Sequence, residues 1–98
     1  MKKKDFKKKA EILKAMAHPV RLMIIDLLSK REHCVCEILP YTDLDQSTLS
    51  RHLSVLKNSN IIEDEKRGQK VYYKLLCPCV LHSLDCIESM TKWGNNGF

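Results

Sequence analysis

The stretch of residues 45–58 constrains the fold of this chain more than any other. Leu49, Leu53 and Leu56 recur at the spacing of one apolar helix face. The carboxylate of Asp45 can accept a hydrogen bond from a backbone N–H group of the first turn. We therefore predict a helix that begins after Asp45 and packs on a core through its leucine face.

The opposite face of this predicted helix carries short polar and basic side chains and no carboxylate. Its members are Gln46, Ser47, Thr48, Ser50, Arg51 and His52. Base edges in the major groove of DNA offer hydrogen-bond donors and acceptors, so such a face suits a nucleic-acid reader. An ordinary amphipathic surface helix shows the same pattern, and the residues that follow decide between the two interpretations.

The charge balance favours a polyanionic partner. The 98 residues include 17 Lys and Arg against 12 Asp and Glu, for a formal net charge of +5. A basic balance is typical of proteins that bind nucleic acid or a membrane surface. At this length we expect a single domain over residues 1–98, with a lysine-rich start over 1–9 and a disordered end over 94–98. A core this small gains from burial between subunits.

The sequence contains no apolar run of about 20 residues, so no membrane span is expected. Its charged start lacks the apolar segment of a secretion signal. We therefore expect a cytoplasmic protein whose five cysteines are reduced thiols. In that compartment, clustered cysteines indicate metal ligands or reactive thiols.

Two helices are predicted on either side of the dipeptide His18-Pro19. Proline suits a first helical turn, and the residue before it is biased away from helix. One helix is therefore expected over residues 6–17 and a second over residues 19–30. We expect His18 to act as a cap and Arg21 to lie on the solvent side of the second helix.

The residues after the second helix predict a helix-turn-helix. A third short helix is expected over residues 33–40, and residues 42–45 form the turn into the polar-faced helix. This order of short helix, tight turn and second helix is typical of DNA-binding modules. Asn60 can adopt the left-handed conformation that ends the second helix of the pair.

A β-hairpin follows directly. Residues 61–65 and 71–75 are rich in strand-forming side chains, and Gly68 supplies the turn between them. The cations near the tip are Lys66, Arg67 and Lys70. Such a wing can reach phosphates or a neighbouring groove. The alternative is a hairpin whose charges serve solubility alone.

A last helix is expected over residues 78–93. Its apolar stripe consists of Val80, Leu84 and Ile87, with Leu81 and Met90 beside it. Because this helix follows the wing, we expect its apolar face to meet the same helix, or the first helix, of a second subunit. Cys86 is expected to be a small buried hydrophobic residue there.

Three motifs, in this order, resemble the ArsR/SmtB family of bacterial and archaeal metal-sensing repressors. They are residues 13–22, 46–56 and 67–75, and the resemblance covers residues 10–76. It implies a mainly α fold with a β-hairpin wing, a winged helix-turn-helix that forms a homodimer through its first and last helices. It also implies a repressor that binds a palindromic operator until an inducer lowers its DNA affinity.

The segment Cys-Val-Cys-Glu-Ile at residues 34–38 resembles the Cys-Val-Cys-Asp-Leu metal box of the arsenite-responsive branch of that family. The resemblance places Cys34 and Cys36 at the two leading ligand positions. Leu39 stands where the box has its third ligand, so that arsenite site is incomplete within this helix. The paired histidines of the zinc site of other branches are missing from residues 81–86.

The spacing of Cys34 and Cys36 sets a geometric condition. Side chains two residues apart on a helix point about 200° from each other, so a regular helix cannot aim both sulfurs at one ion. The pair must lie at a frayed helix start, or ligand binding must unwind that turn and shift the helix that follows. Cys77 and Cys79 are candidates for further ligands, from the same or the partner chain.

Several interpretations of the cysteines stay open. Soft thiolates favour As(III) or Sb(III), or another soft ion such as Cd(II), Pb(II) or Zn(II), as inducer, with no permanent cofactor. Paired thiols also suit a redox or reactive-sulfur switch on the same fold. A permanent structural Zn(II) site could use Cys34, Cys36, Cys77 and Cys79. The cysteines could also be inert.

An enzyme is not expected. A dithiol oxidoreductase uses Cys-x-x-Cys in a strand–helix context, whereas this chain has Cys-x-Cys. The sequence therefore predicts a DNA-binding repressor that a thiophilic metal or metalloid releases. Its expected partners are double-stranded operator DNA and a second copy of itself, with no membrane and no small-molecule substrate.

Overall fold

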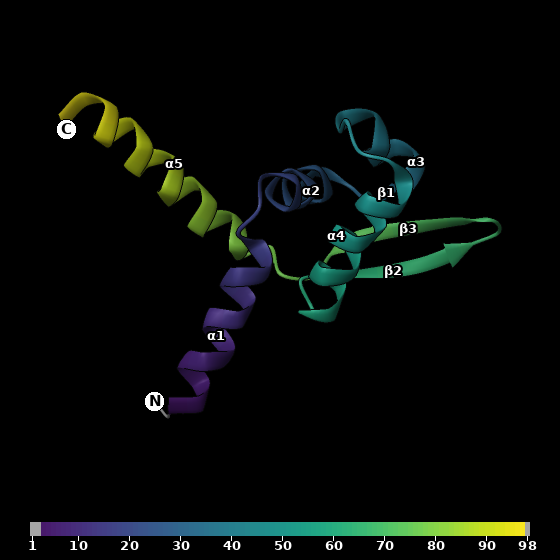
Figure 1. Ribbon diagram of the computed structural model, residues 1–98, viewed down its shortest axis with the longest axis horizontal. Coiled ribbons are helices and arrows are strands. Elements are labelled where there is room, and N and C mark those ends of the chain that lie inside the picture. Colours follow the sequence, from purple (N-terminus) through teal and green to yellow (C-terminus); the bar gives the residue numbers. More distant parts are fainter. Residues whose placement is uncertain (1–2, 98) are drawn as a thin grey trace.

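The computed structural model describes residues 3–97. The elements are α1 (Lys3–Met16), α2 (Pro19–Lys30), β1 (His33–Cys34), α3 (Val35–Ile38), the 3-10 turn η1 (Leu39–Tyr41), α4 (Gln46–Asn58), β2 (Ile62–Arg67), β3 (Lys70–Leu75) and α5 (Val80–Gly97). A central body contains α2, α3, α4 and the sheet, and the hairpin of β2 and β3 projects from one side of it (Figure 1). The helices α1 and α5 extend from the other side (Figure 1).

The starts of α2 and α4 follow from their capping residues. His18 is extended, and its Nδ1 accepts a hydrogen bond from the N–H of Val20 at 3.1 Å. Asp45 Oδ1 accepts one from the N–H of Thr48 at 2.8 Å. Hydrogen bonds from the side chain and backbone of Thr48, and then from Ser47, hold the pKa of Asp45 below its usual value. Both predicted helix starts are therefore confirmed.

The leucine face of α4 lies in the core. Leu49, Leu53 and Leu56 are at most 1% exposed, and burial of each stabilises the fold by about 1.5–3 kcal/mol. They meet Ile24 and Ile25 of α2 in one cluster. At the end of α4 the backbone reverses through Asn60, which has the predicted left-handed conformation with φ of 60°. The core therefore fixes α4 by one face and leaves the opposite face open.

The sheet is antiparallel in the order β1-β3-β2. The prediction of a third helix starting at His33 was wrong, because His33 and Cys34 form a short strand that pairs with Tyr73 and Tyr72 of β3. Only Val35–Ile38 is α-helical, and η1 continues it. A two-residue strand has no alternation to recognise, and its partner lies about forty residues further along the chain. The observed architecture confirms a mainly α fold with a β-hairpin wing.

The outer parts of α1 and α5 carry exposed apolar side chains. Ala15 and Met16 at the end of α1 are buried in the core. Further out along the two helices, four apolar side chains are exposed. They are Phe6 and Leu13 of α1, with exposed fractions of 58% and 61%, and Ile87 and Met90 of α5, with 54% and 70%. In a single chain these side chains face solvent, as expected of surfaces that a second subunit covers.

Three expectations for the last helix need correction. The helix begins at Val80 rather than residue 78, so Cys77 and Cys79 lie in the turn before it. It continues to Gly97, so residues 94–97 are helical rather than disordered, and residue 98 lies outside the described residues. Cys86 is exposed in the single chain rather than buried. The expected basic start covers residues 1–9. Residues 1 and 2 lie outside the described residues, and the rest belongs to α1.

Among residues 3–97, no helix is both long enough and apolar enough to cross a membrane.

Candidate nucleic-acid interface and thiol site

The open face of α4 is a polar surface that runs along the helix. Its lining residues are Gln46, Ser47, Ser50, Arg51, Ser54 and Val55. Arg51 is the only cation among them, and it is exposed. The surface contains four of the six residues that the sequence singled out on this helix. It also contains Ser54, which we missed, although its position seven residues after Ser47 places it on the same face.

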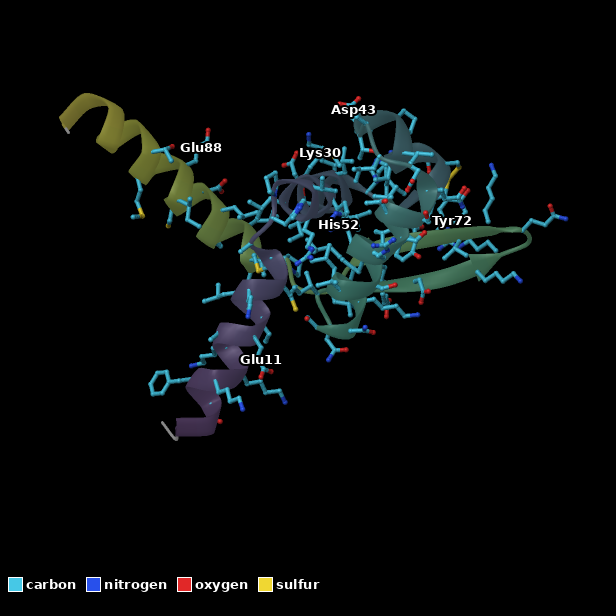
Figure 2. The ribbon with its side chains drawn as sticks, viewed as in Figure 1. Glu11, Lys30, Asp43, His52, Tyr72 and Glu88 are labelled. Carbon is cyan, nitrogen blue, oxygen red and sulfur yellow. A yellow bond between two sulfur atoms is a disulfide. The ribbon has the colours of Figure 1, made fainter. Side chains whose placement is uncertain are left out.

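His52 lies behind this face. Its ring is half-buried, and Figure 2 places it in the central body beside α2 and α4. Its Nδ1 accepts a hydrogen bond from Arg21 Nε at 3.1 Å, and its ring centroid is 4.3 Å from that of His18. The structure therefore turns His52 away from the outer face of the helix. Thr48, one turn earlier, is also half-buried, and its N–H group is bound to Asp45.

Arg21 does not lie on the solvent side of α2 as expected. Besides its bond to His52, its Nη1 donates to the carbonyl oxygen of Ala15 at 3.1 Å. Helix ends leave carbonyl groups without helical partners, and Arg21 satisfies one of them at the end of α1. A single side chain thus connects α1, α2 and α4. The sequence contains one signal for this contact that we missed. His18 and Arg21 lie close to Pro19, and a second histidine, His52, lies in α4.

The tip of the wing is built by Gly68 and Gln69. Gly68 has φ of +64°, a conformation that favours glycine. The register pairs Arg67 with Lys70 and Lys66 with Val71, so all three predicted cations are gathered near the tip. Lys66 and Lys70 are exposed and take part in no ion pair within the described part of the chain. They are therefore available to a phosphate.

Arg67 is engaged with carboxylates. Its Nη1 and Nη2 donate to the two carboxylate oxygens of Glu32 at 3.0 and 2.9 Å, and Nη2 also donates to Glu65 at 2.9 Å. The guanidinium lies 4.9 Å from the ring centroid of Tyr72. Glu65 and then Glu32 raise the pKa of Arg67 above its usual value. A phosphate that approaches Arg67 competes with two carboxylates.

Cys34 and Cys36 are joined by a disulfide bond. Cys34 has extended backbone just before α3, whereas Cys36 lies in the first turn of that helix, so the two sulfurs can meet. This placement agrees with the predicted position at a helix start. The bond contradicts the expectation that all five cysteines are reduced, although Cys77, Cys79 and Cys86 are free.

The disulfide lies between the start of α4 and the wing. A hollow of about 290 Å³ contains both cysteines. Its lining consists of Cys34, Val35, Cys36, Leu39, Gln46, Gln69, Lys70 and Val71. Cys34 is 2% exposed, and its N–H donates to Glu37 Oε1 at 3.0 Å. That bond, and then a bond from Arg31, lower the pKa of Glu37.

The donors in one chain do not complete a metal site. Among the described residues, no group of three or more Cys, His, Asp or Glu side chains could hold a metal ion. Cys77 instead lies by the turn after α4, with its Sγ 3.7 Å from the carbonyl oxygen of Asn60. The structural Zn(II) site of four cysteines from one chain is therefore not formed, and Cys77 and Cys79 do not join Cys34 and Cys36 within the protomer. Leu39 in the lining is apolar and supplies no ligand.

Comparisons with known proteins agree with one another. The model of the family described as "Bacterial regulatory protein, arsR family" matches residues 18–64. The arsenical resistance operon repressor of Staphylococcus xylosus is 39% identical over 71 residues, which cover 72% of this chain and 68% of the relative.

Solved structures show the same fold. The crystal structure of NolR from Sinorhizobium fredii has a TM-score of 0.80 and 33% identity, covering 89% of this chain and 87% of that one. The solution structure of the homodimeric winged helix-turn-helix domain of Mb0332 from Mycobacterium bovis has a TM-score of 0.77 and 26% identity. It covers 95% of this chain and 86% of that one.

Proposed function

The chain belongs to the arsR family of bacterial regulatory proteins, and from this membership we propose a homodimeric transcriptional repressor that a thiophilic ion releases from its operator. The members of the family are DNA-binding regulators, so the prediction that the chain is not an enzyme is confirmed. We also propose a cytoplasmic location, because that is where an operator would be bound.

The open face of α4 is the proposed reader. Arg51 is an exposed residue of a surface that lacks carboxylates, and arginine can donate two hydrogen bonds to a guanine edge in the major groove. Gln46 and the serines on the same surface add hydrogen-bonding groups. Lys66 and Lys70, and Arg67 once its carboxylates release it, would contact phosphates and position the helix. Thr48 and His52 act from behind the face.

A dimer accounts for the exposed apolar side chains of α1 and α5. Phe6 and Leu13 of α1, with Ile87 and Met90 of α5, would be covered by a second copy of the chain. The Mb0332 domain, which shares the fold, is homodimeric. A two-fold dimer presents two α4 helices, and such dimers bind half-sites about one helical turn apart.

The proposed inducer site is the Cys34–Cys36 pair in its reduced form. The observation that carries this proposal is that the two sulfurs share a hollow with Gln46, the first residue of α4. A ligand that changes the start of α3 would therefore act next to the reader. Two sulfurs favour soft ions, and the arsenical resistance repressor among the relatives supports arsenite or antimonite over Cd(II), Pb(II) or Zn(II). A third ligand would come from outside the protomer, with Cys77 and Cys79 of the partner chain as candidates.

A second candidate is a thiol switch, which the disulfide itself favours. In this case hydrogen peroxide takes two electrons and two protons from the two thiols, so that the two S–H bonds break, one S–S bond forms, and the O–O bond is cleaved to give two waters. A thiol reductant reverses the step. The repressor would then respond to oxidants through the same pair of cysteines.

The test is release of DNA from the reduced protein. A fluorescent duplex selected from a random library by the wild-type protein is saturated with protein, and arsenite, antimonite, Cd(II), Zn(II) or hydrogen peroxide is added while anisotropy is recorded. The proposal predicts release by arsenite or antimonite, which Cys34→Ser and Cys36→Ser each abolish. Cys86→Ser, a change of an exposed cysteine outside the hollow, is the matched control and should respond as wild type. Release by peroxide alone supports the thiol switch, and release that survives both substitutions rejects the site.

A further inference from the structure

Three side chains from three segments meet behind the reading helix: His18 before α2, Arg21 in α2 and His52 in α4. Arg21 Nε donates to His52 Nδ1 at 3.1 Å, and the rings of His18 and His52 lie 4.3 Å apart at an angle of 44°. The core leucines of α4 fix the helix along one face. This junction is a polar contact of the same helix with α2, and it lies one residue from Arg51.

The contacts define the charge state of the junction. Arg21 carries only donors, so the Nδ1 atom of His52 that accepts its N–H must be unprotonated. Likewise, Nδ1 of His18 accepts the N–H of Val20 and must be unprotonated. Both imidazoles are therefore neutral in this arrangement, with their protons on Nε2. A proton added to His52 Nδ1 removes the acceptor for Arg21.

The groups that act directly on the charge of His52 are another imidazole and two arginines, whereas the carboxylate of Glu11 lies beside Arg21. The charged and titratable groups on the adjoining elements are His18, Arg21 and Arg51, then Glu11 and Lys14 of α1 beside Arg21, and the Lys57–Asp64 ion pair between α4 and β2. Within residues 3–97, Arg21 forms no ion pair. Protonation would thus place cations side by side in a half-buried site. Burial first, and then His18, Arg21 and Arg51, lower the pKa of His52.

We propose that His18, Arg21 and His52 are positioning residues that hold α4 in its DNA-reading orientation only while His52 is uncharged. Acid conditions therefore weaken sequence-specific DNA binding. A histidine that touches DNA would give the opposite pH dependence. When protonated, it adds a cation next to the phosphates and strengthens binding in acid. The inference rests on the proposed DNA-binding function, and it concerns the orientation of the reader rather than the inducer.

The experiment measures the Kd of the selected duplex and of a scrambled duplex from pH 8.0 to 5.0 at constant ionic strength. Because the pKa of His52 lies below the ordinary histidine value, the Kd of the selected duplex should rise on the acid side of that value, by up to about tenfold per pH unit for one group that must lose its proton. The scrambled duplex should bind equally well or more tightly in acid. His52→Gln keeps an acceptor for Arg21 but does not titrate, so its affinity should be flat over the same range.

His82→Gln is the matched control, because His82 is exposed on α5 outside the junction, and this variant should keep the pH dependence of the wild-type protein. Circular dichroism at each pH confirms that the fold persists, and long-range nitrogen–proton NMR spectra should show the Nε2-protonated tautomer of His52. The proposal is overturned if the affinity of the wild-type protein for the selected duplex stays constant or rises in acid. It is also overturned if the affinity of His52→Gln falls in acid as much as that of the wild type. Failure of the wild-type protein to prefer the selected duplex at pH 7.5 instead overturns the DNA-binding function, so the two failures are distinct.

Discussion

Arg67 at the wing and Glu32 before β1 form a bidentate ion pair, with nitrogen–oxygen distances of 3.0 and 2.9 Å. Glu32 lies two residues before Cys34, and β1 pairs with β3 of the wing. The wing is therefore tied, by side chains and by backbone, to the segment that carries the cysteine pair. A rearrangement at the start of α3 can reach the wing as well as α4.

The ion pair predicts that Glu32→Gln strengthens DNA binding. Loss of this carboxylate frees part of the Arg67 guanidinium for a phosphate, so the plot of log affinity against log salt should steepen by about 0.9 for one added contact. Glu63→Gln makes the same change in net charge on β2, where Glu63 pairs with Lys74 instead. Equal steepening in both variants would show that net charge, rather than release of Arg67, is responsible.

Arg51→Ala should remove a base contact. We expect a loss of about 1–3 kcal/mol, or roughly 5- to 150-fold in the affinity for the selected duplex, with little change for a scrambled one. Lys30→Ala removes an exposed cation of α2 and serves as the control. Anisotropy titrations measure both, and an Arg51→Ala protein that keeps full preference for its duplex would exclude this face as the reader.

Leu13→Glu should dissociate the dimer. A charge in the apolar surface of α1 meets the partner chain, and we expect the dimer dissociation constant to rise by at least about tenfold, which corresponds to 1.4 kcal/mol. Tyr41→Glu, at an equally exposed aromatic residue in η1, is the control. Sedimentation equilibrium gives the masses. Dimers that persist in Leu13→Glu, or that also fail in Tyr41→Glu, would place the interface elsewhere.

Gly68→Val should loosen the tip of the wing. The positive φ of Gly68 costs a branched side chain about 1–2 kcal/mol, although an added Cβ would meet no atom within 4 Å. Gly68→Asn should be milder, because asparagine tolerates this conformation. Hydrogen exchange of the β2 and β3 amides measures the effect. Unchanged protection in Gly68→Val would mean that the turn does not need this backbone conformation.

Most of the fold could be predicted from local patterns. The cap at Asp45, the leucines that follow it, the proline at the start of α2 and the glycine of the hairpin each act within a few residues of themselves. The strand β1 could not be predicted, because its two residues have meaning only through their pairing with β3.

The residues of the candidate site could be predicted from the sequence, but the orientation of their side chains could not. Helical spacing places His52 beside the outer face, but it does not reveal that Arg21, 31 residues earlier, offers a hydrogen bond from behind. The ion pair of Arg67 likewise depends on the carboxylate of Glu32, which lies 35 residues away in the sequence. The position of Cys34 in extended backbone follows from the strand, so the disulfide became evident only with the structure.

The central claim is that two copies of this chain read DNA through α4. The most direct measurement is in vitro selection of duplexes from a random library, followed by determination of the mass of the complex on the selected sequence. We expect a palindromic sequence, with half-sites about one helical turn apart, bound by two protomers. A protein that selects no sequence, or that binds its duplex as a single protomer, would show that paired α4 helices do not read DNA.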